Sequence, residues 1–112
     1  MCKKLMFKTK GAVYALPVDS IIYMEKKLRK IRLHTKEENI EFYGKFPDIV
    51  SMLDGRFLYC HRSYVINMDE IVIMTDNEIY VSNNECIPFG RDAYCRAKRI
   101  FQNYLSQKQK TS

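Results

Sequence analysis

The stretch FLYCHRSYVIN, residues 57–67, places a histidine and an arginine between two apolar runs. Aromatic and β-branched residues on both sides favour a pleated, half-buried backbone, so we expect strands at 57–60 and 63–67. A protein core accommodates an unpaired arginine only at a large energetic cost. His61 and Arg62 are therefore expected at a connection between strands, where a rigid scaffold presents them to water or to a ligand.

The segments on either side of this stretch repeat its strand-like pattern. Short apolar or alternating runs occupy residues 3–9, 13–18, 21–25, 31–35, 40–43, 71–74, 78–81 and 86–89. Alternation with a period of two is typical of a sheet that has one water-exposed face. Short, closely spaced strands favour antiparallel pairing over βαβ units. The sequence predicts a mainly β fold of packed antiparallel sheets, arranged as a sandwich or as an open barrel.

Two segments follow a helical period instead. Within residues 46–54, four apolar residues have the i, i+3, i+4, i+7 spacing of a helical stripe, and Pro47 suits a first turn. Apolar residues between 91 and 106 also share one helical face. We therefore expect a short helix near 46–54 and a C-terminal helix near 91–106, with residues 108–112 as a frayed polar tail.

The size and charge of the chain limit the classes of function to consider. Its 112 residues suit one domain, 1–112, and a hydrophobic content of 46% supports a folded core. Nineteen Lys and Arg against 13 Asp and Glu give a net charge of +6, which favours a polyanionic partner. Because no apolar run approaches the roughly 18 residues of a membrane span and no secretory signal is recognisable, we expect a cytoplasmic protein without a membrane partner.

The four cysteines do not suggest a metal site. Their spacing contains no Cys-x-x-Cys pair, so no metal is expected, and reduced thiols are the default in the cytosol. Cys60 and Cys86 lie in apolar, strand-like segments and are expected in the core. If these two residues face each other across neighbouring strands, they could instead form a redox-sensitive disulfide.

The side chains that catalysis would need are not arranged for it. No motif pairs His34 or His61 with a nucleophile, although a nucleophile must lie within hydrogen-bond reach of its base. The four glycines are isolated, so there is no glycine-rich phosphate loop. We expect no catalytic residue, no cofactor and no enzymatic activity.

Cationic side chains gather in three clusters, each in or beside a predicted connection. The clusters are Lys26, Lys27, Arg29, Lys30 and Arg32; His61 and Arg62; and Arg91, Arg96, Lys98 and Arg99. Arginine can pair with two acceptors on guanine or hold a phosphate, whereas lysine more often attracts phosphates regardless of sequence. One such cluster would be an ordinary charged surface, but three at similar boundaries favour nucleic-acid binding.

Four segments in order resemble the LytTR-type DNA-binding domain of bacterial transcription regulators. The most specific is FLYCHRSYVINMDEI, with its His-Arg-Ser-aromatic core, and VDSIIYMEK, EFYGKFPDIVSML and IPFGRDAYCRAK resemble the family's early strand, helix and closing Pro-x-x-Arg element. The match extends from about Leu5 to Phe101. The resemblance implies packed antiparallel sheets and sequence-specific binding to double-stranded DNA in transcription regulation, with loops in successive major grooves.

The resemblance also implies roles for individual residues. The base-reading candidates are Arg32, Arg62 and Arg91, with Arg29 as an alternative to Arg32. The residues implied to contact the DNA backbone or to support the contact are Lys26, Lys27, Arg29, Lys30, Ile31, His61, Ser63, Asn67, Arg96 and Arg99. Of these, His61 is expected to be structural, and Asn67 is expected to bond backbone groups at a strand end. Gly90 stands where many members carry a side chain, which removes a phosphate contact or loosens the loop that aims Arg91.

Partners follow from the resemblance as well. Members often lie behind a phosphoacceptor receiver domain in two-component response regulators and bind paired direct repeats as dimers. We therefore expect promoter direct repeats as the DNA partner, a homodimer on that DNA, and a receiver domain if this chain is a fragment of a longer protein. Two other functions stay open: a basic β module that binds an acidic protein, and a single-stranded nucleic-acid binder that uses tyrosines for stacking.

Overall fold

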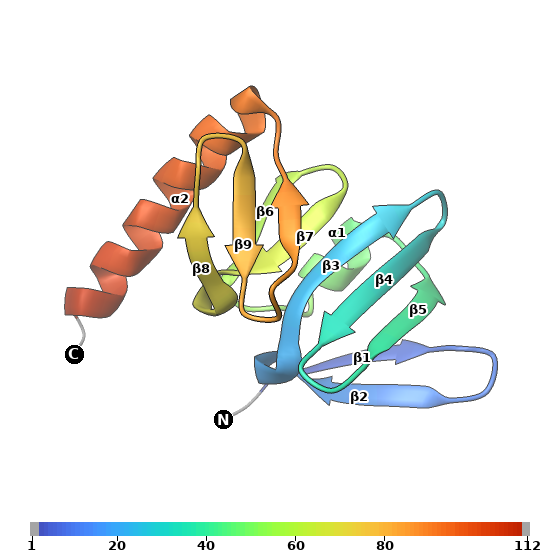
Figure 1. Cartoon of the computed structure of the whole chain (residues 1–112). Coiled ribbons are helices and arrows are strands. Elements are labelled where there is room, and N and C mark those ends of the chain that lie inside the picture. The colour runs from blue at the N-terminus through green and yellow to red at the C-terminus, as the bar shows by residue number, and fades with distance from the viewer. Residues whose placement is uncertain (1–2, 111–112) are drawn as a thin grey trace.

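The computed structural model describes residues 3–110, except for the side chains of Cys60, Gln109 and Lys110. Figure 1 shows strands arranged in three sheets, with a long C-terminal helix on the left and the first hairpin at the lower right. The elements are β1 (Lys4–Lys8), β2 (Val13–Pro17), η1 (Val18–Ser20), β3 (Ile21–Lys27), β4 (Lys30–Thr35), β5 (Asn39–Tyr43), α1 (Phe46–Val50), β6 (Phe57–His61), β7 (Tyr64–Asn67), η2 (Met68–Glu70), β8 (Ile71–Met74), β9 (Glu78–Val81), β10 (Cys86–Pro88) and α2 (Arg91–Lys110).

The central sheet contains five strands in the order β5-β4-β3-β7-β6, and each neighbouring pair is antiparallel. Met24 of β3 lies opposite both Leu33 of β4 and Val65 of β7, and all three side chains are fully buried. Directly opposite residues of antiparallel strands share a face of the sheet. This row therefore forms an apolar face that needs a cover.

The β1–β2 hairpin and α1 provide that cover and close the first core. Leu5, Phe7, Phe46 and Ile49 pack against the apolar face of the central sheet. A second core forms where Ile22, Tyr23, Leu58 and Ile66 meet the three-stranded sheet β10-β9-β8 and α2. The prediction of a mainly β fold of packed antiparallel sheets is confirmed.

The prediction of one water-exposed face needs a correction for the central sheet, because both of its faces contribute to a core. His34 illustrates the difference. It lies on the polar side of β4, as its alternation with Leu33 predicted, yet it is buried and stacks on Tyr23 with 4.1 Å between ring centroids. Its Nε2 lies 3.2 Å from Glu25 Oε1, which supplies a polar partner for the buried ring.

The helices begin where the sequence predicted but end elsewhere. The helix predicted over 46–54 is only Phe46–Val50 in the structure, because the backbone N–H groups of Met52 and Leu53 turn to carbonyls three residues back. Helix α2 continues past the predicted end at 106 to Lys110. Tyr104 and Lys108 each donate a hydrogen bond of 2.6 Å to Asp69 after β7, so Lys108 belongs to the helix and not to a frayed tail. Residues 111 and 112 of that predicted tail lie outside the described residues.

The prediction that Cys86 lies in the core is wrong. Along β10, Cys86 and Pro88 are exposed and only Ile87 between them is buried, so the strand turns the thiol outward. The Cys86 thiol donates to Glu78 Oε2 on the neighbouring strand at 3.0 Å. The partner in the suggested disulfide, Cys60, has its side chain outside the described residues.

Asn67 holds the end of β7 in the way the sequence predicted. Its side-chain Nδ2 donates to the carbonyl of Ile21 at 2.8 Å, and its Oδ1 accepts from the backbone N–H of Asp69 at 3.0 Å. The Asn67 side chain is buried, since the residue is only 1% exposed. The first of these hydrogen bonds is buried and joins β7 to the start of β3, and the second is partly buried and begins η2. None of the helices within residues 3–110 is long and apolar enough to cross a membrane.

Candidate nucleic-acid interface

The connection from β6 to β7 carries the histidine and arginine that the sequence singled out. His61 ends β6 and lies opposite Tyr64, which begins β7, so only Arg62 and Ser63 form the turn. The Nδ1 atom of His61 accepts a hydrogen bond from the backbone N–H of Ser63 at 3.0 Å. The ring also packs on Tyr64 and Phe89, with centroids 5.1 and 5.0 Å away. His61 thus fixes the turn from within, which agrees with its expected structural role, and Arg62 is exposed at the tip.

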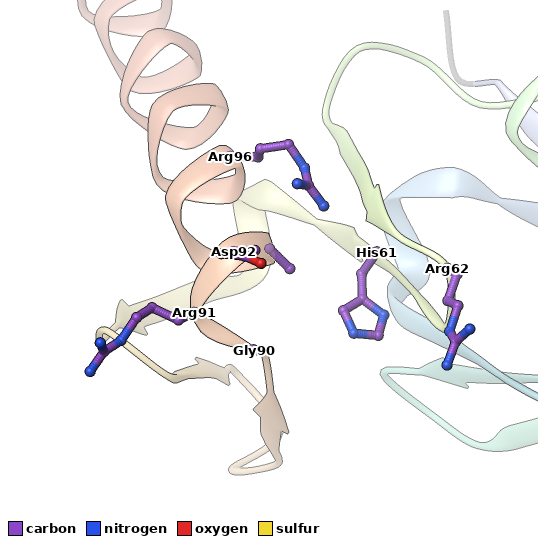
Figure 2. Close-up of a pocket in the computed structure, with 7 residues that line it drawn as sticks. His61, Arg62, Gly90, Arg91, Asp92 and Arg96 are labelled. Atoms are coloured by element: carbon purple, nitrogen blue, oxygen red, sulfur yellow. The ribbon is translucent and has the colours of Figure 1, made fainter.

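A hollow of about 450 Å³ separates this turn from the first turns of α2. Figure 2 shows His61 and Arg62 on one side of it and Arg91, Asp92 and Arg96 on the other, with Arg96 directed toward His61. Arg91 points outward on the far side of the helix start. The fold therefore brings the second and third cationic clusters together around one opening, although they are about 30 residues apart in sequence. Arg99 is exposed on α2 outside the hollow.

Burial and the charges around this hollow both favour the neutral form of the His61 ring. Partial burial lowers the pKa of His61, and the nearby positive charges of Arg62 and Arg96 lower it further. Because an ordinary histidine has a pKa of about 6.5, the ring is neutral at pH 7. Its Nδ1 accepts from Ser63, so the proton of the neutral ring resides on Nε2 and is available to an acceptor.

We expect an NMR titration of the His61 ring to give a midpoint below about 6.5. Replacing Arg62 by glutamine should raise that midpoint, because it removes a neighbouring positive charge. The folded state favours the neutral ring, so the unfolded state binds more protons and stability falls as the pH drops below about 6.5. Arg99→Gln is the control with the same loss of charge, and an equal rise in that variant would contradict the assignment to Arg62.

Arg32 lies on the same face of the central sheet as His61. A row of directly opposite residues runs across the five strands through Glu41, Arg32, Glu25, Tyr64 and His61. However, the Nε and Nη2 atoms of Arg32 donate to Glu41 Oε2 at 3.0 and 2.8 Å, and Nη1 lies 3.9 Å from Glu25 Oε1. Arg32 therefore faces the expected side of the molecule, but carboxylates already engage its guanidinium.

The β3–β4 hairpin presents the remaining cations of the first cluster. Lys27 lies opposite Lys30, and Lys30 lies opposite Tyr43 of β5, so these three side chains share a face with Arg32. Leu28 at the tip is 96% exposed and has a φ of 58°, a left-handed conformation that an L-residue adopts at some cost. Arg29 is exposed beside it, whereas Ile31 is fully buried. Ile31 can thus support the hairpin from the core but cannot touch DNA with its side chain.

Sequence reasoning did not include the β1–β2 turn among the candidate residues. Lys8 and Lys10 from this turn, with Lys30 and Tyr43, line a hollow of about 570 Å³ next to the β3–β4 hairpin. The only sign in the sequence was a pair of lysines near Gly11, which marks a turn. Their position beside Lys30 depends on how the first hairpin packs on β5.

The fold and the cationic openings define a small β domain suited to a polyanion, and the comparison with known families gives its class. The LytTr DNA-binding domain family matches residues 11–102. The chain therefore belongs to this family and is a DNA-binding domain.

Two relatives and one solved structure agree with that assignment. Accessory gene regulator protein A of Staphylococcus aureus is 37% identical over 71 residues, which are 60% of this chain and 29% of the regulator. The regulator of the same name from Staphylococcus epidermidis matches to the same extent. The LytTr domain of a Bacillus cereus protein, described as a methyl-accepting/DNA response regulator, has the same fold with a TM-score of 0.75 at 18% identity. That match covers 88% of this chain and 95% of the Bacillus domain.

Proposed function

We propose that this chain binds double-stranded DNA in a sequence-specific manner in bacterial transcription regulation, as a single domain over residues 1–112 and without enzymatic activity. The observation that carries the proposal is the hollow between the β6–β7 turn and the start of α2, whose lining residues include Arg62, Arg91 and Arg96. No ion pair of the described residues involves Arg62 or Arg91. These two guanidinium groups are therefore available to acceptors on base edges or phosphates.

The dimensions of the molecule suit contacts with more than one groove. Its longest extent is 40 Å, which exceeds the roughly 34 Å of one helical turn of DNA. In Figure 1 the start of α2 lies at the top of the view and the β3–β4 hairpin at the right. Loops at these two places can reach successive major grooves on one face of a duplex, with backbone contacts between them.

Recognition is divided between two kinds of side chain. Arg62 and Arg91 are the main candidates for reading bases, since their planar groups can pair with two acceptors on guanine. Lysines of the β3–β4 hairpin supply attraction that does not depend on sequence. The contact set at the DNA backbone consists of Lys26, Lys27, Arg29, Lys30, Ser63, Arg96 and Arg99.

The wider role concerns a longer protein. The matched segment spans less than a third of the staphylococcal regulators, so the rest of such a protein is not represented here. We infer that the domain works in the cytoplasm as part of a response regulator with a receiver domain, and that it binds promoter direct repeats as a homodimer.

Selection of bound duplexes from a random pool tests the proposed function. A recurring short motif in the selected duplexes is the expected result, because bases are read by a few arginines at fixed positions. Retention of all sequences alike would contradict sequence-specific binding and favour a general polyanion binder. A preference for single strands over duplex would favour the stacking mode, in which aromatic side chains hold unpaired bases.

Glu41→Gln should strengthen binding to every duplex. The substitution removes a negative charge beside the hairpin and replaces the ion pair of Arg32 with weaker hydrogen bonds to an amide oxygen, which Arg32 can exchange for a phosphate. The plot of log affinity against log salt should become steeper by roughly one unit, as one more phosphate is neutralised. Glu37→Gln, in the turn of the β4–β5 hairpin, removes the same charge away from Arg32 and should leave the slope unchanged. A slope that is equal for wild type and Glu41→Gln would show that Arg32 does not reach DNA when released.

A further inference from the structure

The β1–β2 hairpin is held rigidly against the edge of the central sheet. Phe7 of β1 stacks on Phe42 of β5 with 4.1 Å between ring centroids and on Tyr14 of β2 at 4.9 Å. The backbone N–H of Thr9 closes the turn by donating to the carbonyl of Ala12 at 2.9 Å. Anchoring by buried aromatic rings fixes where the lysines of this turn are presented.

The surface that this hairpin shares with its neighbours is strongly positive. Two adjoining hollows, of about 570 and 550 Å³, both include Lys30, Glu41 and Tyr43 in their walls. Their basic residues are Lys8, Lys10, Lys27, Arg29 and Lys30. Glu41 is the one carboxylate among the residues that line them, and it is already bonded to Arg32. Among the described residues, no ion pair involves Lys8, Lys10 or Lys30.

This surface adjoins the face of the central sheet that carries Arg32. Lys27 and Lys30 belong to the hairpin that shares a face with Arg32, and Lys30 Nζ lies 5.4 Å from the ring centroid of Tyr43. Tyr43 is 71% exposed, so its hydroxyl is accessible as a donor. Figure 1 shows the turns of β3–β4 and β1–β2 on the same right-hand side of the view. A duplex that contacts the β3–β4 hairpin can therefore continue past the β1–β2 hairpin.

We propose that the β1–β2 turn is a further DNA-contacting element, in which Lys8 and Lys10, beside Lys30 and Tyr43, hold the phosphate backbone outside the segment read by the arginines. The inference rests on the proposed function, and it extends the contacted DNA beyond the three cationic clusters. We assign this contact to phosphates, because a lysine ammonium is a compact point charge that more often attracts phosphates regardless of sequence.

The salt dependence of binding to a duplex of about 30 base pairs, roughly three helical turns, tests this inference. Fluorescence anisotropy should show that Lys8→Gln and Lys10→Gln each lower the slope of log affinity against log salt by roughly one unit. The double variant should lower it by about two units. Loss of affinity should be similar on a selected duplex and on one of scrambled sequence, because phosphates are common to both.

Lys4→Gln is the matched control. Lys4 points outward from the same strand as Lys8, at the other end of that strand. Lys4→Gln therefore removes one charge from the same hairpin, far from the turn. Slopes of Lys8→Gln and Lys10→Gln equal to wild type would overturn the inference, as would an equal change in Lys4→Gln. Arg62→Ala distinguishes a failure of this inference from a failure of the proposed function. If Arg62→Ala weakens binding to the selected duplex while the lysine variants bind like wild type, only the β1–β2 contact is wrong.

Discussion

Alanine at Arg62 should weaken binding to the selected duplex by about 1–3 kcal/mol, or roughly 5- to 150-fold. The same loss is expected for Arg91→Ala. Both residues line one hollow, with the Arg91 side chain directed outward from it, and neither is engaged in an ion pair of the described residues. A bidentate pair with a base is lost completely on truncation, whereas the phosphate contacts of other residues continue. Affinity for a scrambled duplex should therefore fall much less.

Arg62→Lys distinguishes base reading from charge. Lysine keeps the positive charge but lacks the planar fork, so this variant should bind scrambled DNA like wild type and lose most of the preference for the selected duplex. Titrations of both duplexes by anisotropy at one salt concentration measure the two affinities. If Arg62→Ala lowers the affinity for both duplexes equally and Arg62→Lys restores both affinities, then Arg62 holds phosphate and does not read sequence.

Asn67→Ala should lower the free energy of unfolding by about 2–5 kcal/mol. The side chain is buried and makes two hydrogen bonds, one to the Ile21 carbonyl and one from the Asp69 N–H. Each buried group left without a partner costs roughly 1–3 kcal/mol. Chemical denaturation measures this loss directly. Because β7 begins directly after the Arg62–Ser63 turn, Asn67 also helps to hold this turn to the central strand β3.

Two further variants show whether burial causes this loss. Asn67→Asp keeps an acceptor for the Asp69 N–H but has no donor for the Ile21 carbonyl, and it introduces a buried charge, so it should also be strongly destabilising. Asn83, whose Oδ1 accepts from the Glu85 N–H at 3.1 Å, makes a similar local bond on the surface. Asn83→Ala should cost less than about 1 kcal/mol. Similar losses for Asn67→Ala and Asn83→Ala would contradict the importance of the buried bonds.

The strands were predictable because their signal is local. Residue alternation depends on neighbours in the chain, and the observed strands fall within a few residues of the expected ranges. Helix ends were less predictable. The end of α2 is set by Tyr104 and Lys108 reaching Asp69, more than 30 residues away, and no local pattern contains that contact.

The candidate interface shows the same limit. Arg62 was predictable as an exposed group because an arginine between two strand-like runs has few places to go. The hydrogen bonds between Arg32 and Glu41 were not predictable, since they depend on the register between β4 and β5. The outward turn of Cys86 and the place of Lys8 beside Lys30 likewise depend on which strands become neighbours.

By itself, the sequence determined the antiparallel strands, the two helix starts, the exposed turn of Arg62 and the membership in a DNA-binding family. Only the tertiary structure decided which cations meet around one opening, which are neutralised by carboxylates, and that the first hairpin joins the basic surface. Secondary structure follows from periodicity over a few residues. The grouping of charges follows from strand register and sheet packing, which bring together residues that no short pattern relates.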